Sequence, residues 1–284
     1  MPEISVVVVT YNSELYIKEC LDSVLRQPFG EGDIVVVDNN SRDRTAELIK
    51  SLYPRILLIE NPENMGAAYA RNQGIGRSQG TWVLTLDCDV VLKDDFLSGM
   101  DGTLRSAGRS AGMIQPKVLR YGTNEIYTCG IRLGWSRRFF DIGMGCADSG
   151  KFDTVMNILG PCSAASFYRR DMLEEVKDGY GYFDQRFFFL VEDVDLAWRA
   201  SRKGWKTLYC PDAVCYHRGN SSASSKKMRQ YLCFCNRYYS ILKNEGLAAY
   251  LLKVLPFFCY DLPRYLYLLL TNGYMYKGAR TSCL

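Results

Sequence analysis

The chain has 284 residues, which is enough for one large domain or for a domain with an appendage. Its 48% hydrophobic and 23% charged residues are those of an ordinary globular protein, which excludes a disordered chain. The net charge of +4 is unevenly placed, because residues 226–284 hold nine basic and two acidic residues. That segment carries +7 and leaves −3 for the residues before it. It is also rich in Tyr, Phe and Leu, which favours an anionic membrane surface over nucleic acid as a partner.

Strands and helices are predicted to alternate over the first 90 residues. Continuous apolar, β-branched runs predict buried strands, and amphipathic spacing predicts the helices between them. The predicted strands are Ile4–Val9, Ile34–Val37, Ile56–Ile59 and Trp82–Leu86. The predicted helices are Ser13–Arg26, Thr45–Leu52 and Ala67–Arg77. This order indicates an α/β fold with a parallel sheet, in which ligands bind beyond the carboxyl ends of the strands.

The rest of the chain is less regular. Residues 101–182 are rich in glycine, and we expect loops and mixed strands over a pocket there. A helix is predicted at Glu192–Lys203, closed by Gly204, and then a strand from Trp205 to Val214 that ends at His217. A polar loop at 219–222 follows, and the tail after Ser225 is predicted to be helical.

The cysteines and the start of the chain indicate the cellular compartment in which we expect the protein. The eleven cysteines show no C-x-x-C spacing, and the first strand begins too early to leave room for a signal peptide. We therefore expect reduced thiols and a cytoplasmic protein. The basic tail suggests a peripheral position on the inner face of the cell membrane.

Polar clusters follow three of the predicted strands, at Thr10–Asn12, Asp38–Asn40 and Asp87–Asp89. The carboxylates of Asp87 and Asp89 are costly to bury at the end of an apolar strand without a counter-charge. A divalent cation that carries a phosphorylated ligand supplies this charge, since oxygen ligands suit Mg²⁺ or Mn²⁺. Three such clusters on one edge of the sheet indicate a binding site.

Two further positions allow either a structural or a functional interpretation. Asp38 can accept hydrogen bonds from a base or ribose, or it can form a turn with Ser41 that caps the next helix. Asn64–Gly74 is a helix start opened by glycine, with Arg71 directed toward the same sheet edge. Arg71 either contacts the ligand or lies on the surface.

The segment Glu192–Asp195 and the single histidine complete the candidate residues. Carboxylates at a helix N-terminus are stabilised by the helix dipole, and one beside an apolar wall can equally act as a general base. Asp195 is predicted to cap the helix or to pair with Arg199. His217 ends a strand before a Gly/Ser loop, which suits a metal or phosphate site.

These motifs, in this order, resemble a family 2 glycosyltransferase with a GT-A fold, and more closely its rhamnosyltransferase-like branch. The matching segments are Val6–Asn12, Val37–Ser41, Asn64–Asn72, Leu86–Asp89, Gly160–Arg170, Glu192–Arg199 and His217–Gly219. The resemblance implies a Rossmann-like, mostly parallel sheet flanked by helices in residues 1–225. Residues 1–100 form its nucleotide-sugar-binding half and 101–225 its acceptor-binding half, and 226–284 form a basic, aromatic-rich helical tail.

The resemblance also implies roles for individual residues. Asp193 corresponds to the general base, supported by Glu192. Asp89 corresponds to the direct ligand of a Mn²⁺ or Mg²⁺ ion, Asp87 is shared between ribose and metal, and His217 helps to hold the ion. The implied nucleotide-sugar-binding residues are Thr10, Tyr11, Asn12, Asp38, Asn40, Asn64, Arg71, Asp87 and Cys88, the last as a small spacer.

The implied activity is that of an inverting, metal-dependent hexosyltransferase of polysaccharide biosynthesis. Its leading donor is dTDP-rhamnose, and its acceptor is a glycan or a lipid-linked glycan, chosen by residues around Trp135 and Gly160–Tyr168. One alternative is a sugar-nucleotide nucleotidyltransferase, which usually carries a Gly-rich loop after the first strand, whereas Thr10–Glu14 has no glycine. Another is a non-catalytic, membrane-docked scaffold of the same fold.

The apolar stretch Leu247–Leu270 of the tail is not expected to span a membrane, since a spanning helix needs about 20 mostly apolar residues. The residues that interrupt it are Lys253, Pro256, Asp261, Pro263 and Arg264. An interfacial helix, a helix that forms a homodimer, or plain packing on the domain are the interpretations that remain.

Overall fold

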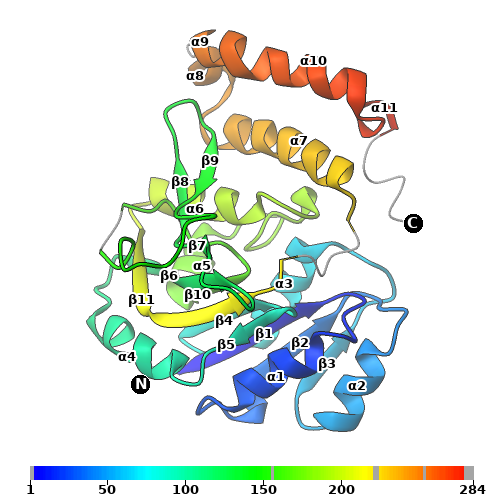
Figure 1. The fold of residues 1–284 in the computed structure, drawn as a ribbon, viewed down its shortest axis with the longest axis vertical. Helices are drawn as coiled ribbons and strands as arrows, with labels where there is room; N and C mark the ends of the chain where they lie inside the picture. The colour runs from blue at the N-terminus through cyan, green and yellow to red at the C-terminus, as the bar shows by residue number, and fades with distance from the viewer. Residues whose placement is uncertain (1–2, 155–156, 220–223, 252–253, 278–284) are drawn as a thin grey trace.

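A computed structural model describes residues 3–154, 157–219, 224–251 and 254–277 (Figure 1). Apart from Gly219, the polar loop predicted at 219–222 lies outside these residues, as does the tail from residue 278. A mixed α/β domain forms the lower part of the described chain, and the helices of the tail lie above it (Figure 1).

Among the described residues, nine strands form the central sheet, in the order β3-β2-β1-β4-β10-β6-β11-β5, with β7 paired to β6. Of these described strands six run in one direction, and β5, β7 and β10 run the opposite way. The predicted mostly parallel sheet flanked by helices is confirmed. The strands are β1 (Ile4–Thr10), β2 (Ile34–Asp38), β3 (Leu57–Glu60), β4 (Trp82–Asp87), β5 (Val90–Leu92), β6 (Ala111–Arg120), β7 (Ile126–Thr128), β10 (Ala165–Arg169) and β11 (Lys206–His217). A separate hairpin consists of β8 (Ile131–Leu133) and β9 (Phe139–Asp141).

The helices of the domain cover the sheet, and those of the tail follow in sequence. The helices are α1 (Ile17–Leu25), α2 (Thr45–Leu52), α3 (Ala67–Arg77), α4 (Phe96–Ser106), α5 (Arg170–Val176), α6 (Glu192–Arg202), α7 (Lys226–Asn244), α8 (Leu247–Leu251), α9 (Val254–Pro256), α10 (Leu262–Thr271) and α11 (Tyr274–Lys277). Short 3-10 turns are η1 (Glu31–Asp33) and η2 (Gln185–Phe187), and η3 (Phe257–Asp261) is a π-helical turn.

Two differences from the predicted helices have local causes. Helix α1 begins at Ile17 rather than Ser13, because the carbonyl of Ser13 accepts the N–H groups of Tyr16 and Ile17, each at 2.9 Å, in a turn before the helix. Helix α4 was not predicted. A Cβ atom on its Gly99 would lie 2.3 Å from the carbonyl oxygen of Asp212, so α4 packs directly on the backbone of β11. Glycine weakens the local helix signal, and tertiary packing determines this helix.

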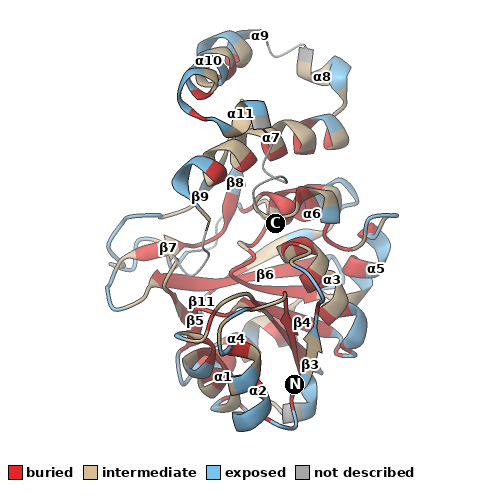
Figure 2. Cartoon of the chain, turned by 90° about the vertical axis from the view of Figure 1, so that its right-hand side faces the viewer, coloured by how far each residue is buried: buried red, intermediate tan, exposed pale blue. Residues whose placement is uncertain are grey.

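The apolar run of β1 is continuous because both faces of the strand are covered. Val6 and Val8 pack into one core with α1, and Val7 faces the opposite core, which Ile75 of α3 shares. The resulting buried sheet forms the centre of the domain in Figure 2. A parallel sheet buried on both faces aligns the carboxyl ends of β1, β2 and β4 at one edge.

Helix α7 joins the tail to the domain: it lies above α6, and α10 lies above α7 (Figure 1). Met228 and Leu232 of α7 pack on the loop that precedes α6. Lys243 lies 2.7 Å from Asp184 and 3.0 Å from Asp195, two carboxylates with fully buried side chains. None of the described helices is long and apolar enough to cross a membrane.

Candidate active site

The three predicted metal ligands lie together. Asp87 ends β4, Asp89 lies in the turn before β5, and His217 ends β11, which pairs with β5. One ligand atom from each residue lies within 4.8 Å of the others. The Nε2 atom of His217 is 3.1 Å from Oδ1 of Asp89, whose Oδ2 accepts the N–H of Gly219 at 3.0 Å.

The donor atoms of this cluster fit a divalent cation. Asp89 is 1% exposed and His217 is 6% exposed, and Nδ1 of His217 has no hydrogen-bond partner among the described residues. Burial alone would lower the pKa of His217, but hydrogen bonding and charge from Asp89 raise it above its usual value. Two carboxylates and an imidazole suit Mn²⁺ or Mg²⁺, and a cation there would bind the neutral form of the imidazole.

Arg71 links this cluster to the candidate base. Its side chain comes from α3, is 3% exposed, and donates to Oδ1 of Asp87 and Oε1 of Glu192, both at 2.6 Å. Burial by itself would lower the pKa of Arg71, but these two carboxylates raise it above its usual value. Arg71 is therefore a buried, charged bridge and not a surface arginine.

Asp193 and Glu192 lie at the start of α6, on the cleft that residues 162–164 also line. Oδ2 of Asp193 accepts the N–H of Ser163 at 3.0 Å, and Oδ1 accepts the N–H of Val194 at 2.8 Å. Burial raises the pKa of Asp193 above its usual value, and it raises the pKa of Glu192 to about 7. Oε2 of Glu192 is buried and has no partner among the described residues. A raised pKa makes a carboxylate a stronger base.

The backbone before α6 adopts an unusual conformation that the tail holds in place. Phe188, Leu190 and Val191 have φ values of 62°, 67° and 75°, in the left-handed region that side chains disfavour. The amide of Asn236 on α7 donates to the carbonyls of Phe187, Phe189 and Leu190 at 3.1, 3.0 and 2.8 Å. Helix α7 thereby helps to position the carboxylates of α6.

The polar residues at the ends of β1 and β2 form a neighbouring cluster. Thr10 pairs with Asp38 in register, and Asp38 is buried, which raises its pKa. Both carboxylate oxygens of Asp38 accept from Ser41, at 2.5 Å from the hydroxyl and 2.9 Å from the N–H, as the turn interpretation predicts. Asn12 accepts the N–H of Arg42 at 2.7 Å.

The remaining predicted nucleotide residues occupy different environments. Asn40 has a φ of 67° in the turn after β2, and Tyr11 is half-buried in the turn after β1. Oδ1 of Asn64 accepts from the amide of Asn39 at 2.8 Å and so joins the turns before α2 and α3. Cys88 points into the core, with its sulfur 2.9 Å from the Ser13 hydroxyl.

A cleft of about 270 Å³ brings several predicted residues together with others that were not predicted. Among its lining residues are Arg71, Asp87, Glu192, Asp193 and His217. Tyr127 and Asp141 were missed, because β7 and β9 are three-residue strands without a recognisable pattern. Burial raises the pKa of Asp141 to about 6, and the charge of Asp193 adds to this effect.

Asp195, the cysteines and Trp135 were also singled out in the sequence. Asp195 pairs with Arg199 at 2.8 Å, as predicted. The ten cysteines among the described residues are free. The exposed Trp135 lies between β8 and β9, away from the lining of the cleft.

Comparisons with known proteins identify the family of this chain. The model of glycosyl transferase family 2 matches residues 5–177. The chain is 30% identical over 228 residues to an N-acetylglucosaminyltransferase of Rhizobium meliloti, covering 75% of this chain and 50% of that protein. It is 30% identical over 194 residues to a PGL/p-HBAD biosynthesis glycosyltransferase of Mycobacterium tuberculosis, covering 67% of each. The chain thus spans about half the length of the rhizobial relative.

Solved structures share the fold at low identity. S. aureus TarS 1-349 in complex with UDP-GlcNAc matches with a TM-score of 0.57 and 19% identity, over 91% of this chain and 73% of that one. A mannosyltransferase of Pyrobaculum calidifontis in complex with GDP-Man and Mn²⁺ matches with a TM-score of 0.57 and 20% identity, over 99% of this chain and 82% of that one. These likenesses support the GT-A fold. The family match covers more than half of the residues, and the chain therefore belongs to glycosyl transferase family 2.

Proposed function

We propose that this protein is an inverting, metal-dependent glycosyltransferase that uses a nucleoside-diphosphate sugar. The observation that carries the proposal is the hydrogen-bonded series in which Arg71 connects Asp87, next to the metal cluster, with Glu192, next to Asp193. In this arrangement the donor diphosphate would bind at the end of the cleft beside the metal cluster, and the proton acceptor would lie at the end beside α6. The membership in the family and the related glycosyltransferases support the same reaction class.

In this proposal Asp89, Asp87 and His217 would hold Mn²⁺ or Mg²⁺. The cation would supply positive charge that stabilises the departing nucleoside diphosphate. Asp193 accepts the proton of an acceptor hydroxyl, while the backbone N–H groups of Ser163 and Val194 fix its orientation. The hydroxyl attacks the face of the sugar opposite the diphosphate, so a single displacement inverts the configuration without a covalent intermediate.

Nucleotide recognition is assigned to the cluster at the ends of β1 and β2. Asp38 would accept from the base, since each of its oxygens keeps a second lone pair beside the bond from Ser41. The walls of this nucleotide pocket would be formed by Thr10, Tyr11, Asn12 and Asn40. Asn64 supports the turns, and Cys88 serves as the small spacer that points into the core.

The related proteins and the sequence motifs indicate different sugar donors. The resemblance to the rhamnosyltransferase-like branch favours dTDP-rhamnose, whereas TarS is described with UDP-GlcNAc and the rhizobial relative is an N-acetylglucosaminyltransferase. The acceptor is a glycan or a lipid-linked glycan. The exposed apolar and basic residues of the tail support peripheral contact with a membrane.

A donor screen tests the proposal. The full chain is incubated with dTDP-rhamnose, UDP-GlcNAc and GDP-mannose, with Mn²⁺ or with EDTA, and release of the nucleoside diphosphate is measured. We expect release from one donor that depends on Mn²⁺. Binding of the nucleoside diphosphates is titrated in parallel, and the absence of both release and metal-linked binding would favour a non-catalytic scaffold.

A further inference from the structure

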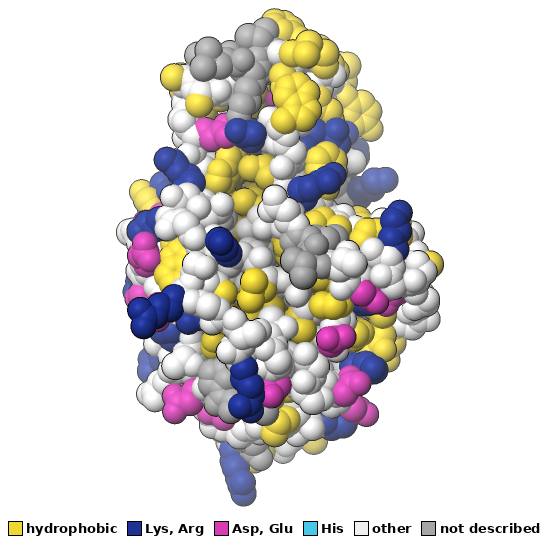
Figure 3. Space-filling view, turned by 90° about the vertical axis from the view of Figure 1, so that its left-hand side faces the viewer, with side chains coloured by type: hydrophobic (Ala, Val, Ile, Leu, Met, Phe, Trp, Pro, Cys, Tyr) yellow, Lys and Arg dark blue, Asp and Glu magenta, His cyan; other side chains and the backbone are white. Residues whose placement is uncertain are grey.

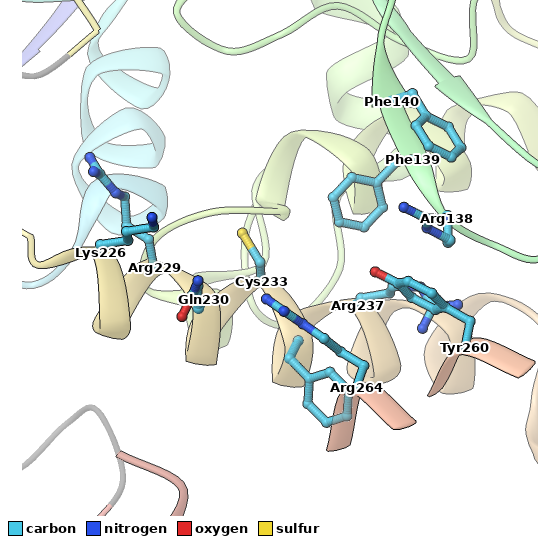
Figure 4. Close-up of a pocket in the computed structure, with 11 residues that line it drawn as sticks. Arg138, Phe139, Phe140, Lys226, Arg229, Gln230, Cys233, Arg237, Tyr260 and Arg264 are labelled. Carbon is cyan, nitrogen blue, oxygen red and sulfur yellow. The ribbon is translucent and has the colours of Figure 1, made fainter. Parts of the chain in front are cut away.

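A second cavity, of about 410 Å³, lies beside the cleft, between the β8–β9 hairpin, α7 and the C-terminal helices (Figure 4). The hairpin contributes Arg138 and Phe140, and α7 contributes Arg229. Tyr260 of η3 and Arg264 of α10 close the other side. We call this space the basic cavity, because five of its lining residues are Lys or Arg and none is Asp or Glu.

The positive charge of the basic cavity is only partly neutralised. Arg237 is occupied, because it lies 2.6 Å from Asp261 and also donates to two backbone carbonyls. Within the described residues, no carboxylate lies within 4.0 Å of the guanidinium groups of Arg138, Arg229 and Arg264. Arg138 instead stacks 4.0 Å from the ring of Tyr260. Like charges gathered in a partly buried space repel each other, and a bound anion removes this cost.

The basic cavity adjoins the cleft. Phe139, Phe140, Arg229 and Cys233 line both spaces. The metal cluster does not line the basic cavity. A molecule with one hydroxyl at Asp193 can therefore extend past the two phenylalanines to the arginines, on a path separate from the donor diphosphate.

We propose that the acceptor carries a phosphate or diphosphate ester close to its accepting sugar, and that Arg138, Arg229 and Arg264 bind this group. Guanidinium groups suit phosphate because their planar N–H donors match its oxygens in pairs. The inference rests on the proposed function, since the cleft must hold an acceptor for the cavity to receive the rest of it.

Phosphate esters of this kind occur on lipid carriers and on soluble phosphorylated glycans. Figure 3 shows hydrophobic side chains gathered over the C-terminal helices, with Lys and Arg side chains below them. The exposed apolar residues of these helices are Leu255, Phe258, Tyr265, Leu266, Tyr267 and Leu270. A hydrocarbon chain attached to the phosphate would find an apolar surface next to the arginines.

Calorimetric titration of the full chain with decyl diphosphate, in EDTA, tests the proposal. Arg138→Gln, Arg229→Gln and Arg264→Gln are each expected to weaken binding about tenfold, the effect of one lost charge-assisted hydrogen bond. Arg229→Lys should restore part of the affinity. Arg132→Gln, an exposed arginine of the same hairpin outside the cavity, is the matched control and should bind as the unmodified chain does.

Two results would overturn the proposal. One is unchanged affinity in all three glutamine variants with intact thermal unfolding, and the other is binding that occurs only when Mn²⁺ replaces EDTA, which assigns the ligand to the metal cluster. Titration with pyrophosphate, which has no hydrocarbon chain, distinguishes a lipid carrier from a soluble phosphorylated glycan as the ligand. Tighter binding of decyl diphosphate supports a lipid carrier, and equal binding supports a soluble phosphorylated glycan. This titration measures binding without turnover. A negative result here is therefore distinguishable from a negative result in the donor screen, which tests the proposed function.

Discussion

Asp193 combines burial with two backbone hydrogen bonds, which together fix a carboxylate that remains basic. Asp193→Asn keeps the size of the side chain and removes its basicity. We expect transfer to fall by about 10²–10⁴-fold, the usual contribution of a general base, with nucleotide affinity unchanged. Transfer assays and nucleotide titration measure the two effects. Unchanged turnover would show that Asp193 is not the base.

The pH dependence of transfer follows from the direction of the pKa shifts. A base is active when deprotonated, so kcat/KM should rise with pH through a pKa above about 3.9, the usual value for Asp. Asp141 is a like charge near Asp193. Asp141→Asn removes this charge, and we expect it to move the rising limb to lower pH. A pH profile that is the same in both forms would contradict the coupling.

The metal cluster gives a third prediction for single residues. His217→Gln removes the imidazole and the charge that it can carry, and we expect Mn²⁺ to bind about 10–100-fold more weakly. Titration followed by manganese electron paramagnetic resonance measures this affinity. Tyr209→Phe, a change in the same strand but outside the cluster, is the control. Equal affinity in both variants would exclude His217 as a ligand.

At the scale of elements, α7 acts on the loop before α6 through one side chain. Asn236→Leu removes the amide donor from the carbonyls of Phe187, Phe189 and Leu190, of which Phe187 still accepts the N–H of Phe189. We expect a loss of about 2 kcal/mol in the free energy of unfolding and a lower kcat with little change in donor affinity. Urea unfolding measures the free energy of unfolding, and steady-state kinetics measure kcat and the dependence on donor concentration. Lys227→Gln, exposed on α7, should behave as the unmodified chain.

Elements differ in how far local sequence predicts them. Helices α2 and α3 have the predicted bounds, and Gly66 opens α3 with a φ of 87° that glycine adopts readily. A Cβ atom there would lie 2.6 Å from the ring of Phe188, more than 120 residues away. The helix start is thus readable in the sequence, whereas its close contact with the loop before α6 is not.

At the scale of the whole molecule, the boundary predicted at residue 225 can be tested by truncation. Removal of residues 226–284 takes away Lys243 and Asn244, which are partners of the buried Asp184 and Asp195, and among the described residues leaves these carboxylates only Arg186 and Arg199 as charged partners. Loss of partners for buried carboxylates is strongly destabilising. We expect the truncated chain to lose its cooperative thermal transition, measured by circular dichroism. Cooperative unfolding and nucleotide binding by residues 1–225 would show an autonomous domain.

The sequence by itself determined the order of strands and helices as far as β4, the α/β class and the residues at the strand ends, because these follow from short-range periodicity and chain order. The ordered motifs likewise indicated the family. Only the tertiary structure decided that Arg71 is buried between Asp87 and Glu192, 16 and 121 residues away. It also brought Asp141 into the cleft and α7 onto the loop before α6. Contacts of this kind depend on packing between distant segments, which leaves no repeating pattern in either segment.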